Sequence, residues 1–280
     1  MGERLDGQPA HAALKPSLVR RWRVDGPSAE HGLEQVTHSQ AGQEWAPHWH
    51  EEWSVGAVLA GRCHFVLAGQ KHSAGAGDVL AIAPSVVHTC VLDRNNEPGS
   101  LVLMVYAPTD WLNQLGVPAP AASALLHAPA LARSAGAVHN VGSAAEWVAQ
   151  ALPALARGSG ALPAQAPPEG RAGRQVLQAL QRAAAADVPA SIDQLADACS
   201  VSREHFHRVT TRWLGVSPGD YLRAARMSRA RRLLLGGESI AEAALACGFA
   251  DQAHFTRWFR RCFGYTPGAL LQAETAAGVS

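Results

Sequence analysis

Hydrophobic and polar positions divide the chain into two regions with different periodicities. From about Leu33 to Val105, short apolar runs are separated by Gly, Pro and Asn residues. Runs of this length and regular spacing are typical of strands in a β-sandwich or barrel. The clearest runs are Trp53–Leu59, His64–Leu67, Val79–Ile82 and Leu101–Tyr106.

After Thr109 the apolar residues recur with helical spacing. The clearest helix is predicted over Ser143–Ala156, where one apolar stripe contains Trp147, Val148, Ala151, Leu152 and Leu155. Residues 158–173 are rich in Gly, Pro and Ala and have no periodicity, which predicts a linker. From Gln175 to Gln272 the pattern is helical throughout. We therefore expect two domains: an all-β barrel with flanking helices over 1–157 and, after the linker, an all-α domain over 174–280.

A repeat organises the helical region. Shifted by 49 positions, residues 205–219 align with 254–268, with identities that include His205/His254, Arg208/Arg257 and Gly215/Gly264. Upstream the shift is 48, so the one-residue difference falls in a turn. Self-similarity of this kind means that one supersecondary unit is used twice.

Each copy has the pattern helix, tight turn, helix. In the first copy, Ile192–Cys199 is a short helix and Ser202 is a good N-cap for a helix that runs to Trp213. The second copy has a helix over residues 240–247 capped by Ser239, a turn at Gly248, and a helix capped by Asp251 that runs to Phe263. Residues 217–235 predict one long connecting helix. It carries Arg223, Arg226, Arg229, Arg231 and Arg232.

The second helix of each unit has one apolar stripe, which leaves a polar outer face. The stripes are Phe206, Val209 and Trp213 in the first unit, and Phe255, Trp258, Phe259 and Cys262 in the second. The residues that we expect on or beside the outer faces, and predict to contact DNA, are Arg203, Glu204, His207, Arg208, Thr211, Arg212, Gln252, His254, Thr256, Arg257, Arg260 and Arg261.

Charge is distributed unequally between the two halves. The whole chain of 280 residues has a formal net charge of only +1, but residues 171–280 hold 14 arginines against 9 acidic residues, which gives +5. An α-helix with its side chains is about 10–12 Å in diameter and fits the major groove of B-DNA, where basic side chains can contact the duplex. A helical bundle with merely solvated arginines is the alternative, but it does not explain why the arginines repeat in register.

The C-terminal repeat resembles the AraC/XylS family of transcription regulators over roughly 175–271. The resemblance is carried by Gly215–Val216–Ser217–Pro218, Gly248–Phe249, His254–Phe255–Thr256–Arg257 and Gly264–Tyr265–Thr266–Pro267, among others. It implies that Glu204, His207 and Arg208 of the first reading helix, and Gln252, His254 and Arg257 of the second, face bases or backbone. The chain departs from the family at Thr210, where an aromatic is usual, and at Leu271, where an arginine is usual.

Residues 42–92 resemble the cupin-like sensor barrel of the same family. In metal-binding cupins, the positions of His48, His50, Ser54 and His88 hold the ion, but the Glu of that pattern is Ser54 here. Three alternatives remain open. The histidines line an organic-effector pocket without metal, they bind a divalent transition metal with Cys90 or Glu52 completing the site, or they belong to a metal-dependent cupin enzyme.

Four tryptophans are candidates for the wall of an effector pocket: Trp45, Trp49, Trp53 and Trp111. The pocket that we predict consists of His48, His50, Trp53 and His88. The family resemblance also allows the helix over Ser143–Ala156 to pair with a second copy of the chain, as an alternative to packing on its own barrel.

Cysteines and targeting signals limit the compartment. The five cysteines are odd in number and contain no CxxC pair, which fits a reducing environment. No signal peptide or membrane-spanning run is visible, so we expect a cytoplasmic protein without a membrane partner. The predicted function is a sequence-specific regulator that binds double-stranded DNA and a small-molecule effector, with no catalytic residues. A homodimer, and RNA polymerase if the protein is an activator, are further expected partners.

Overall fold

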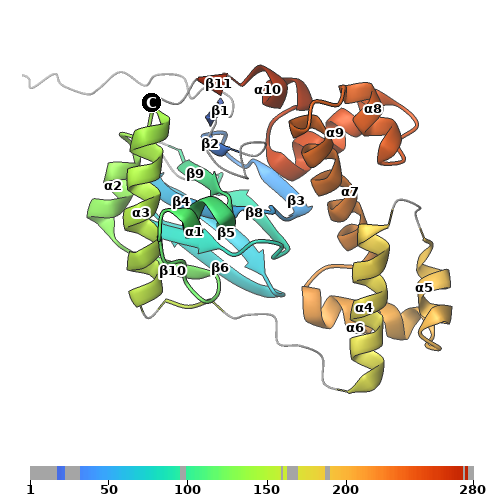
Figure 1. Cartoon of the computed structure of the whole chain (residues 1–280). Helices are drawn as coiled ribbons and strands as arrows, with labels where there is room; N and C mark the ends of the chain where they lie inside the picture. Colours follow the sequence, from blue (N-terminus) through green and yellow to red (C-terminus); the bar gives the residue numbers. More distant parts are fainter. Residues whose placement is uncertain are drawn as a thin grey trace, which may run out of the picture.

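The computed structural model describes residues 18–22, 32–94, 99–158, 160–162, 170–186, 190–273 and 275–276. A β-barrel with helices on its outer side lies beside a helical half (Figure 1). The predicted fold class, a cupin-like barrel followed by an all-α domain, is confirmed. Among the described residues, no helix combines the length and the apolar character needed to cross a lipid bilayer.

Two sheets form the barrel, and in the described part of the chain their strands pair antiparallel except for one short parallel pair at the edge of the larger sheet. The larger sheet has the strand order β10-β7-β4-β9-β2-β1-β11 and the smaller has β3-β8-β5-β6 in the described part of the chain. The strands are β1 (Leu18–Trp22), β2 (Leu33–His38), β3 (Glu44–His48), β4 (Trp53–Ala60), β5 (Arg62–Leu67), β6 (Gln70–Gly75), β7 (Asp78–Ile82), β8 (His88–Leu92), β9 (Leu101–Ala107), β10 (Ala124–His127) and β11 (Thr275–Ala276).

The larger sheet is buried on both faces, which explains why its strands appear in the sequence as continuous apolar runs. Side chains alternate along a strand. In β4, Val55 and Ala57 pack toward the helices, while Val58 belongs to the cluster inside the barrel. In β7, Ala81 and Leu80 divide between the same two clusters. A strand between two apolar layers needs no polar face.

Three helices cover the outer face of this sheet: α1 (Thr109–Gln114), α2 (Pro129–Ala135) and α3 (Val141–Arg157). Asn140 and Ser143 form a capping box that starts α3. The predicted stripe of α3 is buried against its own barrel, and the Trp147 indole donates a hydrogen bond to the Leu131 carbonyl at 3.0 Å. This apolar stripe is therefore not available for pairing with a second copy.

The predicted linker is shorter than expected. The Leu125 amide donates to the Gly160 carbonyl, and the Leu162 amide donates to the Ser123 carbonyl, each at 2.8 Å. Residues 160–162 thus extend the edge of the barrel beside β10, and α4 already begins at Arg171. Backbone pairing of this kind requires no apolar periodicity, so the pattern of side chains does not indicate it. The rest of the predicted linker, residues 159 and 163–169, lies outside the described residues.

The helical half contains α4 (Arg171–Ala185), α5 (Ile192–Ala198), α6 (Arg203–Leu214), α7 (Pro218–Leu235), α8 (Ile240–Ala246), α9 (Gln252–Phe263) and α10 (Pro267–Gln272). It has two apolar clusters, one around Phe206 and one around Phe255 and Phe259. The long helix α7 contributes to both. The predicted connecting helix is confirmed, with Ser217 as its N-cap and Pro218 in its first turn.

The two halves pack against each other through both helical clusters. Val36 and Tyr106 of the barrel belong to the second cluster, and Val87 to the first. At the C-terminus, β11 pairs in parallel with β1, so residues 275–276 of the predicted helical domain join the sheet of the barrel. The helical half is thus held by packing and by backbone pairing.

Two glycines at matching positions of the repeat lie in this contact. Gly215 ends α6 and Gly264 ends α9, both with left-handed φ values, of 71° and 82°. A Cβ on Gly215 would lie 2.3 Å from the Gly69 amide nitrogen, and one on Gly264 would lie 2.5 Å from the Trp45 indole nitrogen. The repeated glycines therefore serve as helix caps and also as points of close approach to the barrel.

We expect Gly215→Ala to destabilise the chain more than Gly248→Ala does. Both glycines have left-handed φ, so each alanine costs about 1–2 kcal/mol of backbone strain. Only at Gly215 would the new methyl group also overlap the backbone of Gly69, because nothing lies within 4 Å of the Cβ position of Gly248. Urea unfolding of the two variants measures the difference, and equal losses would show that the close approach does not contribute to stability.

Candidate functional site

Two helix-turn-helix units make up the helical half, α5–α6 and α8–α9. The turn between α8 and α9 is one residue longer than that between α5 and α6, as the shift in the repeat predicted. Ser200 and Gly248 occupy matching positions and both have left-handed φ, 54° and 76°. The sequence pointed only to Gly248, because serine rarely adopts this conformation.

The predicted N-caps of both second helices are confirmed. The Ser202 side chain accepts a hydrogen bond from the His205 amide at 3.2 Å, and Asp251 accepts one from the His254 amide at 2.7 Å. Each cap satisfies an amide at the N-terminus of a helix and sets the direction in which the helix leaves the turn.

The predicted DNA-contacting residues lie at the surface of α6 and α9. All are exposed except Thr256, which is half-buried. The exposed members are Arg203, Glu204, His207, Arg208, Thr211, Arg212, Gln252, His254, Arg257, Arg260 and Arg261. The barrel therefore packs on the apolar sides of the units and leaves their basic faces open.

Some of these side chains are engaged within the chain. The Trp258 indole donates to His254 Nε2 at 2.8 Å, and the guanidinium of Arg261 lies 4.7 Å from the centre of the same ring. Arg223 of α7 lies 4.3 Å from the Trp258 ring, so two arginines contact this tryptophan. Trp258 is half-buried: it packs against the apolar cluster around Phe255 and Phe259, as its place in the predicted stripe implies, and it also contacts the two arginines. Because the Nε2 atom of His254 accepts the hydrogen bond from Trp258, only its Nδ1 atom is left to contact DNA.

The apolar stripe of α6 also differs from the expected one. Its buried residues are Phe206, Thr210 and Leu214, whereas Val209 and Trp213 are only half-buried. The predicted and the observed stripe lie side by side on α6, and the contacts of α6 with α4 and α7 determine which stripe is buried. Thr210 is accommodated because its hydroxyl donates to the Phe206 carbonyl at 2.9 Å.

The barrel encloses a cavity of about 60 Å³. Its lining residues are His38, Trp45, His48, Cys63, Phe65, Leu80, Ile82, His88, Cys90, Leu92, Val102, Met104 and Tyr106. The volume corresponds to about two water molecules, far below the roughly 300 Å³ of a site for a drug-sized ligand.

The tryptophans take different places from those expected of a pocket wall. Only Trp45 lines the cavity. Trp53 and Trp111 pack in the core between the larger sheet and its covering helices, and Trp49 lies against Tyr221 of α7 with ring centroids 5.1 Å apart. Trp53 is therefore removed from the predicted pocket, because strand alternation turns it to the helical side of β4.

His48, His50 and His88 converge, as the sequence predicted. One ring nitrogen of each lies within 4.8 Å of those of the other two, and all three residues are buried. β3 and β8 place His48 opposite His88 in register, and His50 follows β3 directly. Burial lowers the pKa of His88 to about 4, and it lowers the pKa values of His48 and His50 well below the usual range, so the rings are neutral at neutral pH.

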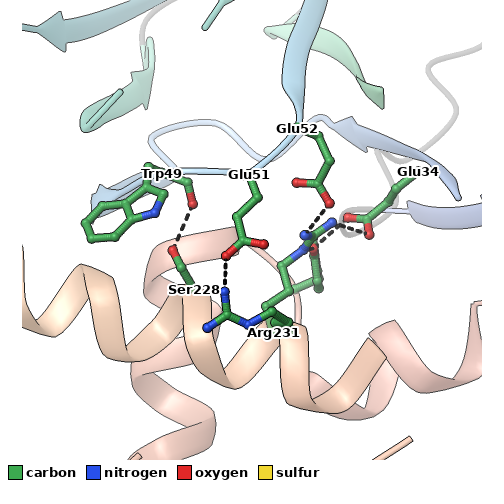
Figure 2. Close-up of polar contacts among 8 residues, drawn as sticks. Glu34, Trp49, Glu51, Glu52, Ser228 and Arg231 are labelled. Atoms are coloured by element: carbon green, nitrogen blue, oxygen red, sulfur yellow. Dashed lines mark hydrogen bonds and ion pairs between the residues drawn. The ribbon is translucent and has the colours of Figure 1, made fainter. Parts of the chain in front are cut away.

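A buried cation joins the barrel to α7. Arg231 donates to Glu52 at 2.8 Å and to Glu34 at 2.9 Å, while the Tyr265 hydroxyl donates to the other oxygen of Glu34 at 2.6 Å. Burial alone lowers the pKa of Arg231, but the two carboxylates outweigh it, and its pKa is raised well above the usual range. Figure 2 shows Arg231 pointing from α7 between the two glutamates.

Neighbouring contacts extend this junction along one face of α7. The Ser228 hydroxyl donates to the Trp49 carbonyl at 3.1 Å (Figure 2). Arg232 pairs with Glu51 at 2.6 Å on the exposed side. The sequence placed Arg231 on the connecting helix with four other arginines and did not distinguish it from them. Its spacing from the buried Ala224 and Met227 was the available signal, because positions 224, 227 and 231 share one face of a helix.

Comparison with known families agrees with this architecture. Residues 31–167 match the family model described as an AraC-like ligand binding domain, and residues 195–273 match one described as a helix-turn-helix domain. The two matches together cover the barrel from β2 to β10 and nearly all of both helix-turn-helix units. The chain belongs to the AraC/XylS family of transcription regulators.

Curated relatives match a part of the chain. The HTH-type transcriptional activator RhaS of Escherichia fergusonii is 36% identical over 88 residues, which is 31% of this chain and 32% of the relative. RhaS of Escherichia coli is 38% identical over 83 residues, 29% of this chain and 30% of the relative. The matched region thus spans about a third of the length of these relatives.

Among solved structures, this AraC/XylS chain is similar in fold to ToxT. A ToxT variant from Vibrio cholerae in its apo form matches with a TM-score of 0.51 and 10% identity, over 91% of this chain and all of that one. ToxT from Vibrio cholerae O395 gives a TM-score of 0.50 and 9% identity, over 88% and 99% of the two chains. The order of barrel and helix-turn-helix units is shared. The family favours a regulator over the catalytic cupin considered above.

We expect Arg231→Ala to lower the free energy of unfolding by about 3–5 kcal/mol, because it leaves two buried carboxylates without their cation. Arg232→Ala is the matched control on the same helix. Its ion pair is exposed, with 53% of the Arg232 side chain accessible, and its loss costs less than about 1 kcal/mol. Urea unfolding followed by fluorescence compares the two variants. A similar small loss for both would mean that Arg231 does not hold the halves together.

Proposed function

We propose that this chain is a sequence-specific regulator that binds double-stranded DNA with α6 and α9 and is controlled by a small ligand through its barrel. The observation that carries the proposal is the repeated helix-turn-helix unit whose basic faces, centred on Arg208 and Arg257, stay exposed while the apolar faces are packed. Solubility alone does not require two such faces at matching positions.

DNA recognition divides between two kinds of contact. Arginines at the middle of α6 and α9 have the length and the donor geometry to bind guanine in a major groove. Arg203, Arg212, Arg260 and Arg261, at the ends of the same helices, are suited to phosphates, as are the helix N-termini. Two reading helices about 34 Å apart along the duplex would enter successive major grooves on one side.

Control by the barrel is supported by a side chain that contacts both the barrel cavity and the second helix-turn-helix unit. Tyr106 lines the barrel cavity and also belongs to the apolar cluster of the second helix-turn-helix unit. The guanidinium of Arg231 lies 5.9 Å from the centre of the Tyr106 ring, and the His50 ring stacks on it at 4.1 Å. A ligand that moves Tyr106 would therefore change the packing of α7 and α9, which is the differential contact that a population shift requires.

The other expected partners remain proposals with less support. A homodimer would have to use a surface other than the apolar stripe of α3, which is buried. Contact with RNA polymerase follows only if the protein activates transcription, as the relatives named RhaS do.

We expect Arg208→Ala and Arg257→Ala each to weaken binding to a selected site by about 1–3 kcal/mol and to relax base preference at one position. The full chain is first used to select sites from random duplexes, and gel shifts then compare the variants. Arg94→Ala is the control, because Arg94 is an exposed arginine of the barrel with 71% of its side chain accessible. Unchanged affinity in both helix variants would refute the assignment of α6 and α9 as reading helices.

Binding should also depend steeply on salt. Neutralised phosphates release counterions, so affinity for the selected duplex should fall about a thousand-fold or more between about 50 and 200 mM salt. The expected slope is smaller for Arg260→Ala if Arg260 contacts a phosphate. A flat salt profile for the unaltered chain would argue against duplex DNA as the partner.

A further inference from the structure

The three converging histidines of the barrel have the form of a ligand site. Their exposed fractions are 4% for His48, 3% for His50 and 6% for His88. Two imidazole nitrogens bound to one metal ion at about 2.1 Å lie about 3.4 Å apart. Small side-chain rotations would bring the present separations, all within 4.8 Å, to that value.

Hydrogen bonds already orient two of the rings. His48 Nδ1 lies 2.8 Å from the Ala46 carbonyl, and His88 Nδ1 lies 2.9 Å from the Val86 carbonyl. A carbonyl can only accept, so each Nδ1 carries the proton, and Nε2 keeps a free lone pair. A backbone acceptor behind the ring is the arrangement that fixes the tautomer of a metal-binding histidine.

His50 gives an independent indication. Both of its ring nitrogens are buried and have no hydrogen-bond partner among the described residues. A buried polar group left without a partner costs about 1–3 kcal/mol, and native structures rarely retain one without a reason. A bond from one of these nitrogens to an ion would remove that cost.

One of the two fourth ligands considered above is already engaged, so the three histidines form the core of the ligand set. Glu52, considered above as a fourth ligand, is held by Arg231 at 2.8 Å. The cavity of about 60 Å³ beside His48 and His88 admits an ion and a water molecule but not a sugar-sized ligand. Neutral imidazoles prefer ions such as Zn²⁺, Fe²⁺ or Co²⁺ and discriminate against Mg²⁺ and Ca²⁺, which prefer oxygen.

We propose that His48, His50 and His88 form a binding site for one divalent first-row transition-metal ion of the Zn²⁺ and Fe²⁺ class. The site lies where the barrel meets the second helix-turn-helix unit, because Phe263 at the end of α9 lies 5.9 Å from the His48 ring and 5.6 Å from the His50 ring, measured between centroids. If the proposed DNA-binding function holds, occupancy by metal would be felt by α9 through Phe263.

The test is metal binding by the full chain, purified without a histidine tag and stripped with a chelator. After incubation with Zn²⁺ or Co²⁺ and desalting, elemental analysis should find one ion per chain, and Co²⁺ should give a visible absorption band typical of nitrogen ligands. His50→Ala and His88→Ala should each weaken Co²⁺ affinity at least about 100-fold. His64→Ala is the matched control, because His64 lies on the same barrel with 49% of its side chain exposed.

Two controls distinguish a loss of metal binding from unfolding and from a loss of DNA binding. Circular dichroism of each stripped variant establishes that it is folded, and His50→Gln provides a milder substitution if His50→Ala is not. Arg257→Ala should bind metal as the unaltered chain does even if it no longer binds DNA, so failure of one proposal is distinguishable from failure of the other. Substoichiometric metal in the unaltered chain, or full metal binding by folded His50 and His88 variants, would overturn the proposal.

Discussion

The buried guanidinium of Arg231 is the interaction on which the relation between the two halves depends. It takes its charge partners, Glu34 and Glu52, from the barrel, while its own backbone belongs to the helix that connects the two helix-turn-helix units. Removing three charged groups from water is costly, and the cost is offset only when each charge meets a partner in good geometry. The pairing therefore holds in one arrangement of the halves, and a small displacement of α7 would expose or isolate the charges.

Side chains from the barrel and from the helical half meet at this junction. Tyr265 completes the hydrogen bonding of Glu34, and Tyr106 lies under Arg231 with its other side toward the barrel cavity. The histidine cluster touches the same tyrosine. The histidine cluster inside the barrel, the ion pairs of Arg231 and the packing of α9 therefore involve some of the same side chains. Coupling between a sensor and a DNA-binding unit needs this kind of continuous contact with two possible arrangements.

Much of the local structure followed from the sequence because local physics determines it. Ser202 and Asp251 cap the helices that the repeat predicted, and Pro218 begins the long helix where it was expected. His48 and His88 were expected on one site, and strand register brings them together. The errors have a common origin. Trp53 and Trp213 are apolar residues whose burial is determined by packing between elements, and residues 160–162 pair through the backbone, which no side-chain pattern records.

The amino-acid sequence by itself determined the two kinds of secondary structure, the duplicated helix-turn-helix unit and the residues on its basic faces, because capping, periodicity and turn chemistry act over a few residues. Only the tertiary structure decided that Arg231 is buried rather than exposed, that Gly215 and Gly264 touch the barrel, and that the barrel cavity is too small for a large ligand. The contacts of Arg231 and of the two glycines join residues more than a hundred positions apart, and their energies come from burial and charge pairing that exist only once the halves have met. The size of the cavity depends on packing among strands within the barrel.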